Sequence, residues 1–400
     1  MSVFADLELA PGDPILGMKE AFLEDSCPDK VNLSIGVYLD ETGRVPLMDC
    51  VRAAEKQLAE QYRPRDYLPI TGLPAYTAAV RDLVFGTDSP AVAEGRVLTC
   101  QSLAGTGALR VGASLLALTA PDAPVLISDP SWENHELLFS RAGFRVGRYR
   151  YYDPASRAVD VAGMLEDLAH AAPGTIVVLH ARCHNPTGCD LTAPDWAEVV
   201  DIVAERGLVP FIDMAYQGFA EGLDQDAQAV RAFAAAGVPY LVANSFSKTF
   251  GLYGERVGGI HFVTETADEA VRVASQVKTV IRSQYSNPPT QGAAIVATVL
   301  TTPELRARWE DELGRMRTRL IGVRSAFRAG LEAAGVTQDL TYLTTQAGLF
   351  SYSGIGRAEM LRLRREFHVY GLDSGRLCLA GLNPGNLEYA VGAIAQVMRP

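Results

Sequence analysis

Short runs rich in β-branched residues alternate with amphipathic stretches through the middle of this 400-residue chain. The predicted strands cover residues 124–128, 175–180, 208–213, 240–244 and 258–263. Helical periodicity fills the segments between them, such as residues 193–205 and 226–236. Strand, helix and strand in repetition predict a mostly parallel sheet, of the seven-stranded type, with helices on both faces. The chain is therefore expected to form an α/β fold.

A second, smaller α+β domain is predicted from the C-terminal third of the sequence. A long helical pattern over residues 303–334 leads away from the sheet, and residues 348–353 and 376–379 read as further strands. Four hundred residues are also too many for one ordinary core. We expect a large domain over residues 46–315. The small domain would combine residues 15–45 and 316–400, after an N-terminal arm over residues 1–14.

Charge and cysteine usage exclude several classes of protein. The formal net charge of −11 gives no electrostatic footprint for nucleic acid or an anionic membrane. No apolar run approaches the roughly 18 residues of a membrane span, and the acidic first residues do not resemble a secretory signal. Six scattered cysteines without a Cys-x-x-Cys motif indicate reduced thiols and predict no metal site. We expect a cytoplasmic enzyme with small-molecule substrates.

Chemically useful side chains follow the predicted strands, at the point where each strand ends. In open parallel sheets, ligands bind just beyond these carboxyl ends. An aromatic ring, an amide, an acid, a phenol, two hydroxyls and an amine would therefore converge at one edge. The residues are Trp132, Asn185, Asp213, Tyr216, Ser245, Ser247 and Lys248.

Lys248 is the best candidate for a nucleophile among only five lysines. It lies between small hydroxyl residues and an apolar segment, just past a buried strand, whereas the other lysines have polar surroundings. A partly desolvated amine has a lowered pKa, as Schiff-base formation requires. Read without its neighbours, Lys248 is equally well a surface lysine in a loop.

The residues around Lys248 meet the demands of pyridoxal phosphate (PLP). Asp213 is placed to keep the pyridine nitrogen protonated, and Asn185 and Tyr216 could donate to the phenolic oxygen. Each has an ordinary alternative, since Asp often caps a helix and Asn-Pro often begins a turn. We interpret Lys248, Asp213 and Tyr216 as the catalytic residues.

A phosphate site is predicted where Gly105 and Thr106 open a helical run over residues 108–119. Backbone N–H groups at a helix start bind phosphate, and Arg256 would add a cation. Gly-x-Gly alone is more often a tight turn, and its spacing here matches neither a dinucleotide fingerprint nor a P-loop. Ser245 is expected beside the same phosphate. Trp132 would stack on the ring, although a tryptophan is more commonly part of the core.

Several long motifs, in order, resemble a class I aminotransferase of the aspartate/aromatic branch, with PLP fold type I. The resemblance runs from residue 12 almost to the C-terminus. Its most specific stretches are residues 31–38, 105–110, 183–188, 213–219, 245–256, 282–289 and 374–376.

The resemblance implies roles that spacing alone does not show. Arg376 matches the arginine that binds the substrate α-carboxylate, and Arg282 one that the neighbouring subunit supplies to a distal carboxylate. Tyr67 matches a tyrosine that reaches across a homodimer to the phosphate. The remaining matches are Gly36 against the substrate, Phe350 as a pocket wall, His135 supporting Asp213, and Ala215 packing on the ring face opposite Trp132; Trp132 and Asn185 would also contact substrate.

The implied reaction is ping-pong transfer of an amino group to 2-oxoglutarate, with Lys248 moving the proton. Three departures from the usual family pattern bear on the substrate. Ala104 stands where Ser or Gly is more usual, and Arg182 stands where a small or apolar residue is more usual. Leu39 and Val45 are apolar where aspartate-selective members often carry polar side chains. The amino-acid sequence of residues 129–144 and 244–259 resembles that of bacterial aromatic aminotransferases, whereas Val37, Thr106 and Asn287 resemble the aspartate type. Aromatic or dual specificity is favoured.

Alternatives remain open from the sequence. A strict aspartate aminotransferase is one alternative. A fold type I decarboxylase or lyase would share Lys248 and Asp213 but would not need Arg282. A PLP-sensing regulator would need an added basic DNA-binding segment, and a nicotinamide dehydrogenase would need an early glycine fingerprint.

Overall fold

The computed structural model describes residues 2–9, 12, 16–61 and 63–399. The predicted N-terminal arm and the start of the resembling region therefore lie partly outside the described residues. The same holds for the outer ends of the predicted small domain, at residues 15 and 400. Within the described part, no helix combines the length and the apolar character that a membrane span requires.

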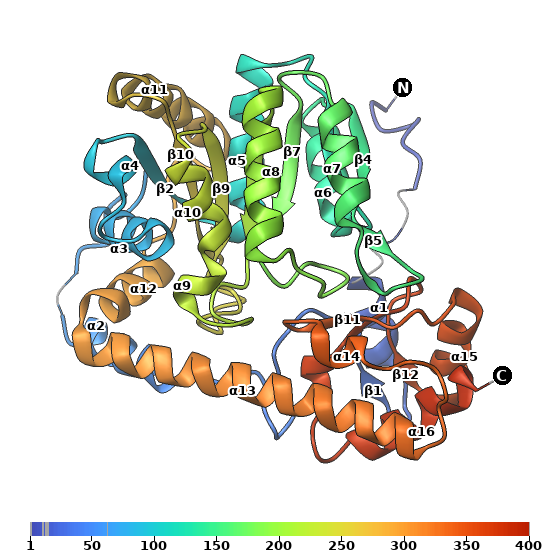
Figure 1. Ribbon diagram of the computed structural model, residues 1–400. Coiled ribbons are helices and arrows are strands. Elements are labelled where there is room, and N and C mark those ends of the chain that lie inside the picture. The colour runs from blue at the N-terminus through green and yellow to red at the C-terminus, as the bar shows by residue number, and fades with distance from the viewer. Residues whose placement is uncertain (1, 10–11, 13–15, 62, 400) are drawn as a thin grey trace.

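A seven-stranded sheet forms the centre of the larger part of the molecule, in the order β2-β10-β9-β8-β7-β3-β4 (Figure 1). Only β10 runs antiparallel to its neighbours, so the predicted mostly parallel sheet is confirmed. The strands are β2 (Val97–Leu103), β3 (Val125–Asp129), β4 (Val146–Arg150), β7 (Ile176–His180), β8 (Val209–Met214), β9 (Tyr240–Ser245) and β10 (Val257–Val263).

Apolar side chains on the two faces of the sheet form two separate cores. One core includes residues of α5, α6 and α11, and the other includes residues of α3, α8 and α10. Figure 1 shows α8 in front of the sheet and α5 behind it. These helices are α3 (Pro74–Phe85), α5 (Ala104–Thr119), α6 (Glu133–Arg141), α8 (Ala193–Arg206), α10 (Gln228–Ala235) and α11 (Ala267–Gln284).

The helix α13 (Pro303–Ala333) connects the sheet domain with a smaller C-terminal unit, as its long pattern predicts (Figure 1). That unit has its own core, to which the first strand of the chain also contributes. Its elements are β1 (Val31–Asn32) paired with β12 (Val369–Tyr370), β11 (Phe350–Tyr352) paired with β13 (Arg376–Cys378), and the helices α14 (Tyr342–Thr345), α15 (Arg357–Phe367) and α16 (Leu387–Met398). The boundaries at residues 45/46 and 315/316 stay a prediction.

The remaining elements are peripheral to the sheet. They are α1 (Leu16–Glu24), α2 (Asp49–Ala59), α4 (Pro90–Ala93), the small ribbon of β5 (Tyr152–Asp153) and β6 (Ala158–Val159), α7 (Val161–His170), α9 (Leu223–Asp226), α12 (Gln291–Thr301) and a short 3-10 turn over residues 379–381.

Two details differ from the sequence-based expectation. The helix expected over residues 226–236 is broken at Ala227, with α9 ending before it and α10 beginning after it. The buried Asp226 carboxylate explains the break, because it accepts backbone N–H groups from the preceding loop. The helix expected from residue 108 begins at Ala104, so Gly105 and Thr106 lie in its first turn.

A buried arginine fixes the segment that leads into β11. Arg324 on α13 is buried, and its guanidinium donates to the carbonyls of Leu343 (3.0 Å), Gly348 (3.0 Å) and Phe350. These carbonyls belong to α14, to the loop before β11 and to the first residue of β11. Arg324 thereby holds Phe350 in place.

We expect Arg324→Met to lower the free energy of unfolding by about 2–4 kcal/mol, because several buried carbonyls lose their donor. Arg328→Met, one turn further along α13, is the control, since Arg328 pairs with Glu332 at the surface. Denaturant unfolding of the cofactor-free proteins measures both. Equal stabilities for the two variants would contradict this role for Arg324.

Candidate active site

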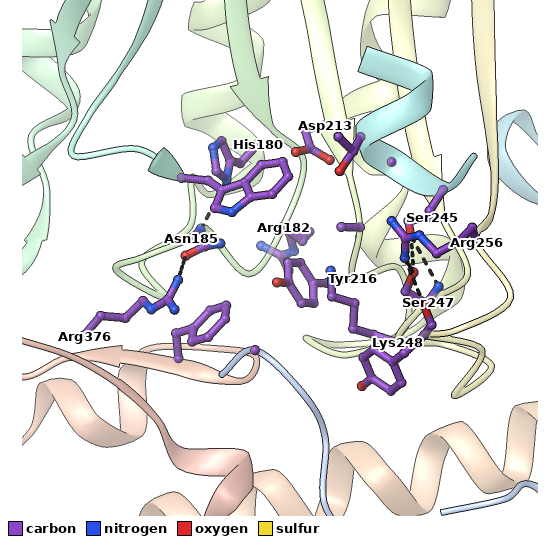
Figure 2. A pocket seen from close by; sticks show the side chains of 18 residues that line it. His180, Arg182, Asn185, Asp213, Tyr216, Ser245, Ser247, Lys248, Arg256 and Arg376 are labelled. Atoms are coloured by element: carbon purple, nitrogen blue, oxygen red, sulfur yellow. Dashed lines mark hydrogen bonds between the residues drawn. The ribbon is translucent and has the colours of Figure 1, made fainter. Parts of the chain in front are cut away.

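A cavity of about 220 Å³ lies beyond the carboxyl ends of β7, β8 and β9, next to the start of α5. Parallel strands bring their last residues to one edge, and His180 and Asp213 are partners across β7 and β8. Figure 2 shows the side chains that point into this space from the sheet and from the C-terminal unit. Predicted residues that line it are Gly36, Gly105, Thr106, Trp132, Asn185, Asp213, Ala215, Tyr216, Ser245, Ser247, Lys248, Arg256, Phe350 and Arg376.

Lys248 lies three residues after β9, with its Nζ 4.8 Å from the centroid of the Tyr216 ring. Burial lowers the pKa of the Lys248 amine to about 8, although the charge of Asp213 works in the opposite direction. A lysine with this pKa has a substantial neutral fraction near neutral pH. The amine is therefore a competent nucleophile and proton carrier.

Asp213 is the ionised partner at the floor of the cavity. Burial by itself would raise the pKa of Asp213, but the hydrogen bond from His135 helps to hold it below the ordinary value. The His135 Nε2 to Asp213 Oδ2 distance is 3.0 Å, and Nδ1 of His135 contacts the Ser131 hydroxyl, also at 3.0 Å. The predicted support of Asp213 by His135 is present. A negative charge here suits a protonated ring nitrogen.

Arg376 and Asn185 are joined across the cavity, one from β13 and the other from the loop after β7. Arg376 is 1% exposed and donates from Nη1 to Asn185 Oδ1 (3.1 Å) and from Nη2 to Ser34 O (2.8 Å). Its nearest ion-pair partner, Glu133, is 4.0 Å away. The guanidinium can therefore bind an incoming carboxylate. Because Asn185 Oδ1 is occupied, its amide NH₂ is left as a donor.

Aromatic groups and a glycine shape the wall beside Arg376. The Phe350 ring centroid lies 4.4 Å from the Arg376 guanidinium carbon. A Cβ at Gly36 would lie 2.7 Å from Phe350 Cζ. A larger residue at position 36 would therefore push into the wall, which is consistent with the predicted close approach of this backbone to a substrate.

The opposite end of the cavity is suited to a phosphate group. The first-turn N–H groups of α5 have no partner within the helix, and they lie where Gly105 and Thr106 line the cavity. Arg256 is held beside them, since its carbonyl accepts from Ala104 N (3.1 Å) and its Nη1 donates to Tyr253 O (3.0 Å) and Ser247 Oγ (3.4 Å). A buried amine, a carboxylate and an anion site together fit PLP.

Two predicted residues do not line this cavity in the single chain. The Tyr67 side chain is 86% exposed, and Arg282 is exposed at the end of α11, where it donates to Ser286. Leu39 and Val45 also lie outside the lining. The roles of Tyr67 and Arg282 depend on a second subunit and stay predictions.

His180 and Tyr253 line the cavity but were not predicted as site residues. His180 Nδ1 accepts from the Asn185 backbone N–H (3.2 Å), and burial lowers its pKa to about 3, so the ring stays neutral. His180 is the last residue of a predicted strand, and this position could have indicated that it belongs to the site. Tyr253 lies in a turn, and its hydroxyl accepts from Tyr38 N at 2.9 Å.

The family model for aminotransferases of class I and II matches residues 28–394. The chain is 54% identical over 398 residues to an aspartate aminotransferase of Pseudomonas aeruginosa, covering 100% of both chains. It is 46% identical over 397 residues to an aromatic-amino-acid aminotransferase of Escherichia coli, covering 99% of this chain and 100% of the relative. The structure of an aromatic-amino-acid aminotransferase from Burkholderia pseudomallei, covalently bound to PLP, is 54% identical with a TM-score of 0.98 over 100% of both chains.

The chain therefore belongs to the aminotransferase class I and II family. It is a PLP-dependent aminotransferase with the fold that the resemblance implied. The decarboxylase, regulator and dehydrogenase alternatives are thereby set aside.

We expect the capture of added PLP by the cofactor-free enzyme to accelerate as the pH rises and to level off above about pH 8. The lowered pKa of Lys248 explains this, because only the neutral amine attacks the aldehyde. Stopped-flow absorbance measures the rate, and Lys248→Ala is the control that should neither capture PLP covalently nor transaminate. A rate that still climbs above about pH 9 would show an ordinary, exposed lysine.

Proposed function

We propose that this enzyme transfers amino groups between aromatic or dicarboxylic L-amino acids and 2-oxoglutarate, as a cytoplasmic homodimer with shared active sites. The observation that carries the proposal is the buried Arg376, whose ion-pair partner Glu133 is 4.0 Å away and which faces the same cavity as Lys248. An α-carboxylate on Arg376 would place the substrate Cα toward Lys248, beside the Phe350 wall.

The chain's own residues supply the proton chemistry and the orientation. PLP, when bound, provides an electron sink for the bonds at the substrate Cα. Lys248 would remove the Cα proton as a base and return it as an acid, a role that its lowered pKa suits. Asp213 would hold the ring nitrogen, and the Asn185 amide and Tyr216 hydroxyl would donate to the phenolic oxygen. Gly105, Thr106, Ser245, Arg256 and the partner's Tyr67 would bind the phosphate.

Dual specificity is supported by the mixture of apolar and charged groups available to a side chain. Phe350 and Trp132 offer aromatic surface within the cavity. Burying an aromatic ring there would contribute about 1–3 kcal/mol. The relatives described above include both aspartate and aromatic-amino-acid aminotransferases, at comparable coverage. Arg282 of a partner subunit would pair with a distal carboxylate when one is present.

A strict aspartate aminotransferase is the second candidate. The specific observation in its favour is the 54% identity to the Pseudomonas aeruginosa aspartate aminotransferase over the whole chain. The two candidates differ in one measurement, which is the turnover of phenylalanine and tyrosine by the native enzyme.

We expect Arg282→Ala to reduce kcat/KM for aspartate by about 100-fold or more, and for phenylalanine far less, since only aspartate loses a charge-assisted pair. Half-reaction kinetics with each donor measure both values. Arg272→Ala, an exposed arginine on the same helix, is the control. Equal losses for the two donors would assign Arg282 a structural role. A native enzyme inert to every aromatic donor would leave the strict aspartate enzyme.

Shared active sites predict that two inactive variants complement each other. In a heterodimer of Lys248→Ala with Arg282→Ala, both lesions fall in one pocket and the other pocket is intact. An equimolar mixture should regain about a quarter of native activity toward aspartate, since half of the dimers are mixed and each has one good site. Differently tagged subunits, purified in tandem, verify the exchange. Proven mixed dimers without activity would contradict the role of Arg282 across the subunit interface.

A further inference from the structure

Arg182 stands where the resembling family usually has a small or apolar residue, and its side chain joins two loops of the active site. It follows β7 by two residues, and its side chain is 14% exposed. The guanidinium pairs with Glu221, and its Nε lies 3.5 Å from Asp226 Oδ1. A third contact runs from Nη1 to Leu191 O at 3.4 Å. Arg182 thus belongs to one loop and pairs with Glu221 of the other loop and with Asp226 at the end of α9.

Each of these two loops is organised by its own acidic side chain. Asp190 accepts the backbone N–H groups of Cys183 (2.8 Å) and His184 (2.9 Å), directly before Asn185. Asp226 accepts three backbone N–H groups from residues 218–221, directly after Tyr216 and Gln217. Asn185 and Tyr216 therefore sit on two rigid loops. Their relative position depends on what joins the loops.

Two of the carboxylates around Arg182 are withdrawn from water, so its ion pairs differ from an ordinary ion pair at the surface. Burial raises the pKa of Asp190 to about 6 and also raises that of Asp226, and the positive charge of Arg182 counteracts both shifts. Arg182 lines the cofactor cavity and also a second cavity of about 490 Å³ behind it. Arg324 lines that second cavity too, but its guanidinium is occupied by backbone carbonyls.

We propose that Arg182 is a positioning residue that locks the loop carrying Asn185 to the loop following Tyr216. The lock holds the Asn185 amide and the Tyr216 hydroxyl, whose side chains both line the cavity in Figure 2, at a fixed spacing. The inference rests on the proposed function, in which these two groups donate to the phenolic oxygen of PLP. It assigns Arg182 no contact with substrate.

The absorbance of the lysine-bound cofactor as a function of pH tests the lock, because donors to the phenolic oxygen stabilise its ionised form. Arg182→Met should raise the pKa of this absorbance change by about 0.5–1 unit, since the donors are no longer held together. Arg364→Met is the matched control, because it removes an Arg–Asp pair at 23% exposure, from α15, away from the cavity. This control variant should leave the pKa of the absorbance change unaltered.

Glu221→Gln separates positioning from a plain charge effect, and it keeps the test usable if Arg182→Met does not fold. Removing a negative charge would by itself lower the pKa of the cofactor, whereas releasing the lock should raise it. A rise supports the proposal. If the pKa of the absorbance change falls or stays the same in Glu221→Gln, the proposal is overturned. It is also overturned if Arg182→Met folds and is less thermostable but leaves that pKa unchanged.

Tyr216→Phe distinguishes a failure of this inference from a failure of the proposed donor roles. It should raise the pKa of the absorbance change whether or not Arg182 acts as a lock. If Tyr216→Phe leaves that pKa unchanged, the donor role of Tyr216 is wrong. If it raises the pKa while both loop variants do not, only the lock is wrong.

Discussion

The parallel pairing of β7 with β8 is the constraint on which the rest of the site depends. It places His180 opposite Asp213 and ends both strands at one edge. From there the backbone turns into two loops, one leading to Asn185 and one to Tyr216. A slip of one residue in this register would turn every side chain of a strand to the other face. Neighbouring residues enter opposite cores, with Phe211 on one face of the sheet and Ile212 on the other, so a slip would disrupt the packing of both cores.

Burial creates the chemistry of the site and also its electrostatic problem. Lys248, Asp213 and Arg376 are charged groups withdrawn from water, and each such group is unfavourable unless it is paired or shifts its pKa. The three groups solve this differently. Lys248 shifts its pKa toward neutrality, Asp213 is hydrogen-bonded by His135, and Arg376 donates to Asn185 and Ser34. The ion-pair partner of Arg376, Glu133, is 4.0 Å away and partly exposed, which suits a residue that receives a charged ligand.

The sequence predicted the parts of the site that local chemistry defines. Lys248, Asp213 and Asn185 follow strands whose apolar pattern is unmistakable, and five predicted strands agree with the structure within one residue at each end. The strands β2 and β4 were missed. Gly147 and two arginines hide the apolar pattern of β4 at the sheet edge, and polar Gln101 and Ser102 interrupt that of β2. The contacts of Arg182 could not be predicted, because they join residues about 40 positions apart through a loop that no periodicity describes.

Arg376 connects the two units of the chain through hydrogen bonds. Its guanidinium belongs to β13 of the C-terminal unit, yet it donates to Asn185 of the sheet domain and to Ser34 near β1. The Arg324 guanidinium, from α13, fixes the neighbouring Phe350 carbonyl. In the proposed function, recognition of a carboxylate by Arg376 thus requires the C-terminal unit to be seated on the sheet domain. The proton chemistry proposed for Lys248 and Asp213 requires only the sheet. A substrate that engages both parts would therefore couple its own binding to the alignment of its Cα with the catalytic amine, as efficient positioning demands.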